Sequence, residues 1–146
     1  DINLIIVGNN NKSNDVIKEI MNFCGERRDI IFTGYVTDDE LVYLYKNSIA
    51  TGFVSFYEGF GLPVLESLSY GKTVICSDQT SIPEVGGDAV EYCNPYDIES
   101  IENAIEKVVL NDNYRRELEK RALIQAAKFS YNKAAEETLK IYSMFK

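Results

Sequence analysis

Short apolar runs alternate along the chain with stretches in which apolar residues recur at helical spacing. The runs are rich in β-branched and aromatic residues and are bounded by glycine or polar residues, which is typical of buried strands. They predict strands at residues 1–7, 30–34, 49–56, 73–76 and 89–93. The helical spacing predicts helices at about residues 15–24, 37–46, 62–70, 98–110, 113–128 and 133–145. This alternation predicts an α/β fold with a parallel sheet.

The helical spacing also predicts which helix faces are buried. In the first helix the face toward the sheet is predicted to consist of Val16, Ile17, Ile20, Met21 and Phe23. The second helix is predicted to open with a capping box at Thr37 and Glu40 and to bury Leu41, Leu44 and Tyr45 in the core. In the helix at residues 98–110 the inward residues are predicted to be Ile101, Ala104, Ile105 and Val108.

The loop after the third predicted strand contains several local signals. Gly59 and Gly61 permit a left-handed backbone or the close approach of a ligand. Pro63 suits the first position of a helix, where no amide hydrogen is needed. Gly71 suits the position just after that helix, and an apolar strand resumes at once. The sequence therefore predicts a strand, a glycine loop, a helix and a second strand over residues 49–76.

Two carboxylates flank this predicted helix start. The first turn of a helix presents unpaired amide hydrogens and about half a positive charge, which favours a phosphate. Glu58 in the loop and Glu66 in the helix repel phosphate, but carboxylates accept strongly from hydroxyls, often through two oxygens at once. Together these groups indicate a ligand with both phosphates and vicinal diols, and a nucleotide sugar fits.

The segment from Glu58 to Glu66 resembles the signature of retaining GT-B glycosyltransferases of family 4 (glycosyl transferases group 1), two glutamates separated by seven residues. This family includes many mannosyl-, glucosyl- and N-acetylglucosaminyltransferases. The resemblance continues in order through residues 34–36, 39–45, 71–75, 82–85, 87–89 and 129–131. Such an ordered set is far more specific than the glutamate pair alone. It implies a C-terminal, donor-binding domain with a Rossmann-like doubly wound parallel sheet and extra C-terminal helices.

The resemblance implies retaining transfer of a sugar from a nucleoside diphosphate donor to an acceptor hydroxyl, without a required metal ion. Glu58 would be the catalytic-site carboxylate that holds hydroxyls of the transferred sugar, and Glu66 would bind the ribose diol. The amides that contact sugar and phosphate would belong to Gly59, Phe60, Gly61 and Leu62. Fixed amide dipoles stabilise the charge that grows on the leaving diphosphate without reorganising.

Further donor-binding residues are implied nearer the N-terminus. Tyr35 and Val36 follow the second predicted strand, where the family binds the base through backbone groups, and Gly8 resembles the turn on the nucleotide side. A lone glycine after a strand is also a common simple turn. Asp78 and Glu84 lie in a predicted polar loop after the fourth strand, where each serves either the site or a helix cap.

The chain length limits the domain organisation. At 146 residues the chain is long enough for one domain with a core and too short for a complete two-domain enzyme. Because it opens directly on an apolar strand, we expect residues 1–146 to be a single nucleotide-sugar-binding domain of a larger enzyme. No apolar run approaches the roughly 20 residues that span a bilayer.

Imidazole chemistry is excluded, because the chain has no histidine. That removes Ser-His-Asp and Cys-His nucleophile systems and every metal motif built on imidazole. The three cysteines, Cys24, Cys76 and Cys93, are far apart and lie in apolar surroundings. Their placement favours reduced, buried thiols and a reducing cytosol.

The formal net charge of −8 is unevenly distributed, since residues 1–110 carry −11 and residues 111–146 carry +3. An acidic body argues against a nucleic-acid surface, which needs clustered Lys and Arg. The basic C-terminal side chains indicate either a peripheral contact with an anionic membrane or, more ordinarily, a solvated helix face. They are Arg115, Arg116, Lys120, Arg121 and Lys128. We expect a cytoplasmic protein, with the inner face of the membrane as the alternative location.

The expected partners are a UDP-, GDP- or ADP-sugar and, through a missing N-terminal domain, an acceptor glycan or lipid of cell-envelope polysaccharide synthesis. The family's basic pair that grips the pyrophosphate also lies on a missing segment, so we expect weak nucleotide binding and no transfer by this chain alone. Two other classes remain open. A sugar-nucleotide epimerase shares the GT-B architecture, although it is expected to use histidines here. A non-catalytic nucleotide-binding or regulatory α/β module would leave Glu58 and Glu66 as solvated caps.

Overall fold

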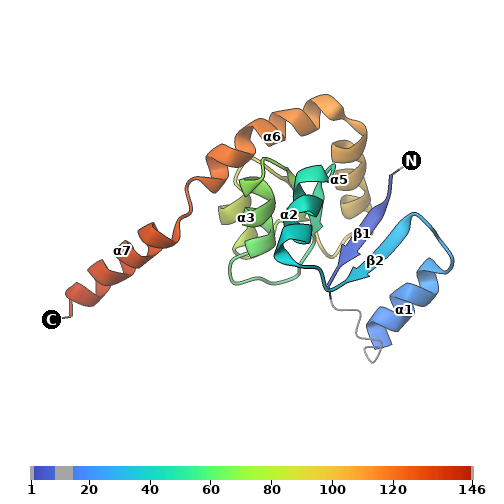
Figure 1. Ribbon diagram of the computed structural model, residues 1–146. Helices are drawn as coiled ribbons and strands as arrows, with labels where there is room; N and C mark the ends of the chain where they lie inside the picture. The colour runs from blue at the N-terminus through green and yellow to red at the C-terminus, as the bar shows by residue number, and fades with distance from the viewer. Residues whose placement is uncertain (1, 9–14, 146) are drawn as a thin grey trace. The chain divides into compact units, whose positions relative to one another are not determined.

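The computed structural model describes residues 2–8 and 15–145, and the chain divides into two compact units, Asp1–Tyr43 and Leu44–Lys146 (Figure 1). Each unit has its own sheet, and both sheets are parallel, as the alternation of strands and helices predicts. The polar run at residues 9–14, for which the sequence predicts a loop, lies outside the described residues.

In the first unit, β1 (Leu4–Val7) pairs in parallel with β2 (Ile30–Gly34), and α1 (Asp15–Cys24) lies between them in the chain. The predicted bounds of α1 and β2 are confirmed. The prediction that Ile20 and Phe23 face the sheet is wrong, because 43% and 93% of their surface is exposed. Residues at a spacing of three or four lie on one helix face, and the partly buried face here is Ile17, Met21 and Cys24.

Helix α2 (Asp38–Asn47) begins with the predicted capping box. The Thr37 amide donates to Glu40 Oε2 at 2.8 Å, and the Glu40 amide donates to Thr37 Oγ1 at 3.4 Å. The Thr37 hydrogen bonds hold the pKa of Glu40 below its usual range. The predicted buried face is confirmed at Leu41, which is partly buried, and at Tyr45, which is only 9% exposed.

The second unit is built on three parallel strands in the order β3 (Thr51–Phe53), β4 (Val74–Ser77) and β5 (Glu91–Cys93). All four residues of the central strand are buried. Its helices are α3 (Leu62–Ser69), α4 (Ile82–Gly86), α5 (Ile98–Leu110), α6 (Asp112–Ala126) and α7 (Tyr131–Ser143). The predicted end of α3 is confirmed, because Gly71 has a left-handed backbone and its amide donates to the Leu68 carbonyl at 3.0 Å.

Two hydrophobic clusters cover the opposite faces of this sheet. Alternate residues of a strand face opposite sides, and accordingly Val74 and Cys76 belong to one cluster while Ile75 belongs to the other. The first cluster contains side chains of α3, α4 and α6, whereas the second contains Ala104 and Val108 of α5. The sheet therefore carries α3 and α5 on different faces.

The strand predicted at residues 49–56 is too long. β3 spans three residues, and Ile49 and Phe56 are 37% and 59% exposed. β-propensity takes effect only where a partner strand is present, and pairing with β4 ends at Phe53.

The loop predicted at residues 77–84 contains the start of a helix. Helix α4 begins at Ile82, whose side chain is fully buried, and Pro83 lies in its first turn. Five residues are too few for an apolar period to be visible in the sequence.

The C-terminal helices differ from the prediction in detail. Ile105 was predicted to face inward, but it is 44% exposed. Helix α7 begins at Tyr131 because Ser130 Oγ accepts from the Lys133 amide at 3.2 Å, and α7 has no buried residue. Among the helices described, none is both long and apolar enough to cross a bilayer.

The predicted burial of the cysteines is confirmed for Cys76 and Cys93, whereas Cys24 is partly exposed. All three are free thiols. Cys76 and Cys93 lie on adjacent strands but belong to clusters on opposite faces of the sheet. Burial raises the pKa of both thiols, so both stay protonated at neutral pH.

Candidate functional site

The glycine loop before α3 has the backbone that the sequence predicts. Gly61 is the residue before the helix, with φ +102°, and Pro63 lies in the first turn. A Cβ on Gly61 would lie 2.6 Å from Ile82 Cδ1, so both the dihedral angle and the available space require glycine. At position 59, neither the backbone nor the available space requires glycine, because φ is not positive and the surroundings are open.

Four successive amide hydrogens at this loop make no hydrogen bond within the part of the chain that the structure describes. They belong to Gly59, Phe60, Gly61 and Leu62. The Gly61 carbonyl accepts from the Val64 amide at 3.0 Å, so the first turn of the helix is formed directly after these residues. Free amides at a helix N-terminus attract anions and polar oxygens. These are the four residues predicted to give backbone amides to a donor.

Glu58 is held by its own loop and by the loop that follows β4. Its Oε1 accepts from Ser55 Oγ at 2.8 Å. Its amide donates to Thr80 Oγ1 at 3.1 Å, and its carbonyl accepts from Ser81 Oγ at 3.0 Å. Thr80 has φ +53°, an unfavourable backbone for a β-branched residue. The carboxylate keeps lone pairs available, while the backbone that carries it is fixed on both sides.

Glu66 lies on the exposed side of α3, and a buried tyrosine holds it. Tyr45 Oη donates to Glu66 Oε2 at 2.9 Å, and the Tyr45 ring stacks on Tyr70 with centroids 5.9 Å apart. Burial and then the Glu66 carboxylate raise the pKa of Tyr45, so the phenol remains a donor at neutral pH. The second carboxylate oxygen has no partner in the described part of the chain and is available to a ligand.

The supporting residues Tyr45, Thr80 and Ser81 are not predicted from the sequence as part of the site. Tyr45 was correctly assigned to the core from its helical spacing, but that spacing does not reveal that its hydroxyl reaches Glu66. Thr80 and Ser81 lie more than 20 residues from Glu58 and carry no local pattern. Only the adjacency of the loops after β3 and β4, which are neighbouring parallel strands, indicates them.

The remaining predicted donor-binding residues belong to the first unit. Gly8 follows β1 with φ +143°, and its amide donates to the Gly34 carbonyl at 3.1 Å. Tyr35 is 83% exposed, and Val36 is partly buried. Since β1 and β2 are parallel neighbours, these residues meet at the carboxyl edge of their own sheet. The glutamates Glu58 and Glu66 lie in the second unit.

Asp78 and Glu84, predicted as either site residues or caps, do not cap any described helix. Asp78 Oδ1 accepts from the Gln79 side chain, and its amide donates to the Cys93 carbonyl at 3.1 Å. Glu84 is exposed on α4. Within the described residues, no group of three or more His, Cys, Asp or Glu is arranged to hold a metal ion.

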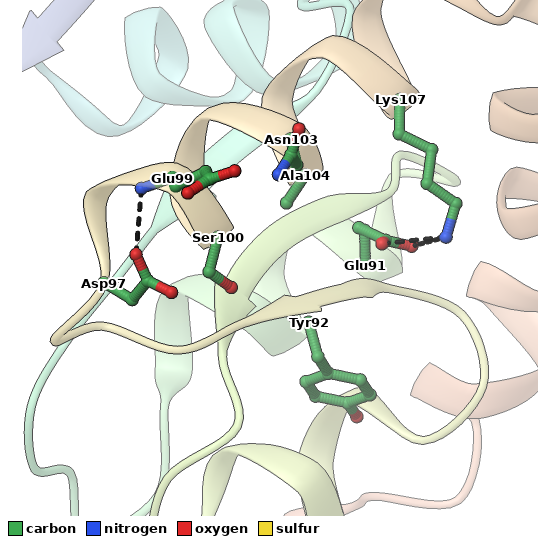
Figure 2. A pocket seen from close by; sticks show the side chains of 8 residues that line it. All are labelled: Glu91, Tyr92, Asp97, Glu99, Ser100, Asn103, Ala104 and Lys107. Carbon is green, nitrogen blue, oxygen red and sulfur yellow. Dashed lines mark hydrogen bonds and ion pairs between the residues drawn. The ribbon is translucent and has the colours of Figure 1, made fainter.

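An open pocket of about 420 Å³ lies elsewhere, along α5 and β5, and includes none of the predicted donor-binding residues (Figure 2). Figure 2 shows Lys107 and Glu91 facing each other, and Lys107 Nζ lies 2.9 and 3.0 Å from the two carboxylate oxygens. Asp97 accepts from the Glu99 amide at 3.0 Å, whereas Tyr92 points away. Because Lys107 is already paired with Glu91 and Asp97 caps α5, the pocket is not the candidate site.

Most of the basic side chains near the C-terminus are paired. The partners are Asp112 for Arg115, Glu117 for Lys120, the Asp88 carbonyl for Arg121 and Gln125 for Lys128. Ion pairs and hydrogen bonds along a helix surface are typical of a solvated face. This pairing favours the ordinary alternative, and a membrane contact stays a prediction.

A family model described as Glycosyl transferases group 1 matches residues 1–125. The chain is 37% identical over 141 residues to O-antigen chain mannosyltransferase B of Escherichia coli, a match that covers 97% of this chain and 37% of that protein. It is 42% identical over 109 residues to serotype-specific mannosyltransferase WbdA of Escherichia coli, covering 75% of this chain and 13% of that protein. The chain thus spans well under half the length of these relatives.

Solved structures show the same fold. Sucrose-phosphate synthase from Thermosynechococcus elongatus superimposes with a TM-score of 0.80 at 23% identity, covering 97% of this chain and 38% of that chain. The Anabaena protein HepE, solved in complex with UDP and glucose, gives a TM-score of 0.81 at 17% identity, covering 97% and 40%. At these identities the likeness concerns the fold alone. The predicted Rossmann-like α/β fold of a GT-B glycosyltransferase is confirmed.

Proposed function

Because the chain belongs to the glycosyl transferases group 1 family and has the GT-B fold, we propose that its second unit holds the diphosphate and sugar of a nucleoside diphosphate sugar donor. The observation that carries this proposal is the row of free amides at residues 59–62, flanked by Glu58 and Glu66. Amides suit the diphosphate oxygens, and carboxylates suit the hydroxyls on either side of it.

Each glutamate has its own role in this proposal. Glu66, held by Tyr45, keeps one carboxylate oxygen available for the ribose diol. Glu58 holds hydroxyls of the sugar that is transferred, and Ser55 fixes its rotamer. Neither carboxylate needs to act as a nucleophile. The developing charge on the leaving diphosphate is stabilised by the amides of the loop, which are already oriented.

The reaction that we propose is transfer with retention of anomeric configuration and without a required metal ion. The leaving phosphate takes the acceptor's proton, so the chain needs no histidine base. Mannose is the proposed sugar, and a cell-envelope polysaccharide the proposed acceptor, because two relatives are named as mannosyltransferases of O-antigen or serotype-specific type. Within the first unit, Tyr35, Val36 and Gly8 remain the proposed donor-binding residues.

The full reaction also requires groups outside these residues. The relatives are considerably longer than this chain. We propose that the basic side chains that grip the pyrophosphate belong to a further segment of this same domain, and that most of the acceptor site belongs to a preceding domain. The 146-residue chain is then expected to bind the donor weakly and to transfer no sugar.

The proposal predicts that Glu66→Ala weakens binding of a nucleoside diphosphate. Calorimetric titration with UDP, GDP and ADP identifies the base, and loss of the hydrogen bonds to the ribose is expected to weaken binding by about 1–3 kcal/mol, roughly 5- to 150-fold. Glu102→Ala is the matched control, because Glu102 is an exposed glutamate on α5.

Equal loss in the two variants, or none in either, would contradict the role of Glu66. Binding by none of the three diphosphates at millimolar concentration, in both this chain and its full-length parent, would contradict the donor site itself.

A further inference from the structure

Two aromatic rings face solvent together beside the candidate site. Phe56 is 59% exposed and Tyr96 is 72% exposed, yet their ring centroids are only 4.9 Å apart with an interplanar angle of 36°. Neither residue belongs to a hydrophobic cluster of the core. Two exposed rings in contact offer a continuous apolar face to a ligand.

The pair joins loops from two strands that are not neighbours. Phe56 follows β3 and Tyr96 follows β5, so their contact passes over the carboxyl end of β4. Both loops are held in place. The Tyr96 amide donates to Asn94 Oδ1 at 3.0 Å, and the loop of Phe56 is closed by the hydrogen bond from Ser55 to Glu58. The two rings are therefore preorganised rather than brought together by a ligand.

The position of the pair relative to Glu58 separates it from the proposed diphosphate site. Phe56 precedes Glu58 by two residues, whereas the free amides follow Glu58 up to the start of α3, and Glu66 lies on α3 itself. Helix α3 packs on one face of the sheet, and α5, which starts just after Tyr96, packs on the other. The rings thus extend the site from Glu58 toward the α5 face, away from the elements proposed to bind the nucleotide.

A polar group at the same strand end also lacks a protein partner. Ser77 is the last residue of β4 and is fully buried, and its Oγ makes no hydrogen bond within the described residues. By the alternation of the strand, Ser77 shares the sheet face of Ile75 and Cys93, which is the α5 face. Buried hydroxyls are rarely left unpaired, which indicates a polar ligand or water at this strand end.

We propose that the Phe56–Tyr96 pair is a stacking platform for a pyranose ring of the acceptor glycan. One face of a pyranose presents C–H groups, which suit the negative face of an aromatic ring. The inference rests on the proposed function, because the acceptor must approach the sugar that Glu58 holds. The location on the α5 side favours the acceptor over the donor's own sugar or base.

The test is saturation-transfer difference NMR on the 146-residue chain with α-linked mannotriose as the probe. We expect saturation to reach the sugar C–H protons, and Phe56→Ala and Tyr96→Ala each to reduce the signal about fivefold, the scale of one lost aromatic contact. Tyr142→Ala is the matched control, since Tyr142 is 66% exposed on α7. Because these side chains are exposed, circular dichroism is expected to show an unchanged fold.

The proposal is overturned if mannotriose gives no transfer at tens of millimolar, or if both platform variants keep the full signal. It is also overturned if the ring protons of Phe56 and Tyr96 shift with GDP or UDP alone, which assigns them to the donor's base. Displacement of mannotriose by GDP-mannose and not by GDP assigns the rings to the donor's sugar instead. Titration of the same variants with nucleoside diphosphates tests the donor site separately. If only the acceptor platform is wrong, nucleotide binding that depends on Glu66 is still observed.

Discussion

Gly61 and Gly59 differ in what the backbone requires of them, although both match the family signature. Gly61 has φ +102° and no room for a Cβ, whereas Gly59 has an ordinary dihedral angle and open surroundings. Their proposed contribution to binding is the same, an amide hydrogen that alanine also supplies. At these two positions, the need of the backbone for glycine can therefore be tested separately from the proposed amide contact with the donor.

We predict that Gly61→Ala destabilises the protein by about 1–3 kcal/mol, because alanine is strained at this φ and its Cβ meets Ile82. Gly59→Ala is predicted to change the free energy of unfolding by less than about 0.5 kcal/mol. Urea unfolding monitored by circular dichroism compares the two. Equal losses would mean that the left-handed turn at Gly61 does not form.

Tyr45 orients the exposed side chain of Glu66 through a hydrogen bond. It is 9% exposed, and its hydroxyl reaches Glu66 Oε2 at 2.9 Å. We predict that Tyr45→Phe weakens nucleoside diphosphate binding by about 0.5–1.5 kcal/mol, roughly two- to tenfold, because Glu66 loses its fixed rotamer. Titration calorimetry measures this. Tyr70→Phe keeps the stacked ring and is expected to leave the affinity unchanged.

The pH dependence of stability gives a second readout of the Tyr45 hydroxyl. The pKa of Tyr45 is raised in the folded protein, so its contribution is fully present below the unfolded value of about 10 and is lost as pH rises above it. Tyr45→Phe is therefore expected to flatten the fall in unfolding free energy above pH 10. Burial also raises the pKa of Tyr92, so some of the fall remains.

At the scale of the element, the site is a junction of the loops that follow β3 and β4. The loop after β3 carries Glu58 and the free amides, and the loop after β4 fixes Glu58 through Thr80 and Ser81. Thr80 adopts a left-handed backbone to do so. Strain of this kind persists where the surrounding structure fixes it, and it is concentrated at functional sites.

We predict that Thr80→Gly and Thr80→Ala weaken donor binding alike but differ in stability. Both lose the hydroxyl that accepts from the Glu58 amide, so both are expected to weaken donor binding by a similar amount. Glycine relieves the strained φ, so Thr80→Gly is expected to be more stable than Thr80→Ala by about 0.5–1 kcal/mol. Thermal unfolding measures which of the two variants is more stable. Full binding by both variants would show that the loop after β4 does not position Glu58.

At the scale of the whole molecule, the strongest local patterns were predictable. The bounds of α1, β2 and α5 follow from apolar periodicity, and the turn at Gly61 and the end of α3 follow from glycine and proline chemistry. The short elements β3 and α4 were not predictable in their bounds, because pairing with β4 and burial of Ile82 define them.

The candidate site also has one part that the sequence predicts and one part that it does not. The glutamates and the amides between them are close in sequence, so a local pattern identifies them. The side chains that hold them, Tyr45, Thr80 and Ser81, come from other segments and are visible only once the strands are placed side by side. The Phe56–Tyr96 pair likewise arises from packing across β4, and nothing in the chain links these residues beforehand.

We propose above all that the amides at residues 59–62 bind the diphosphate of a donor. The most direct measurement is a titration of the ¹⁵N-labelled chain with UDP, GDP and ADP, followed by amide chemical shifts. We expect the amide signals of Gly59, Phe60, Gly61 and Leu62 to shift together when one of the diphosphates is added, and to shift less with its nucleoside. Binding that shifts other amides and leaves these four unchanged would contradict it.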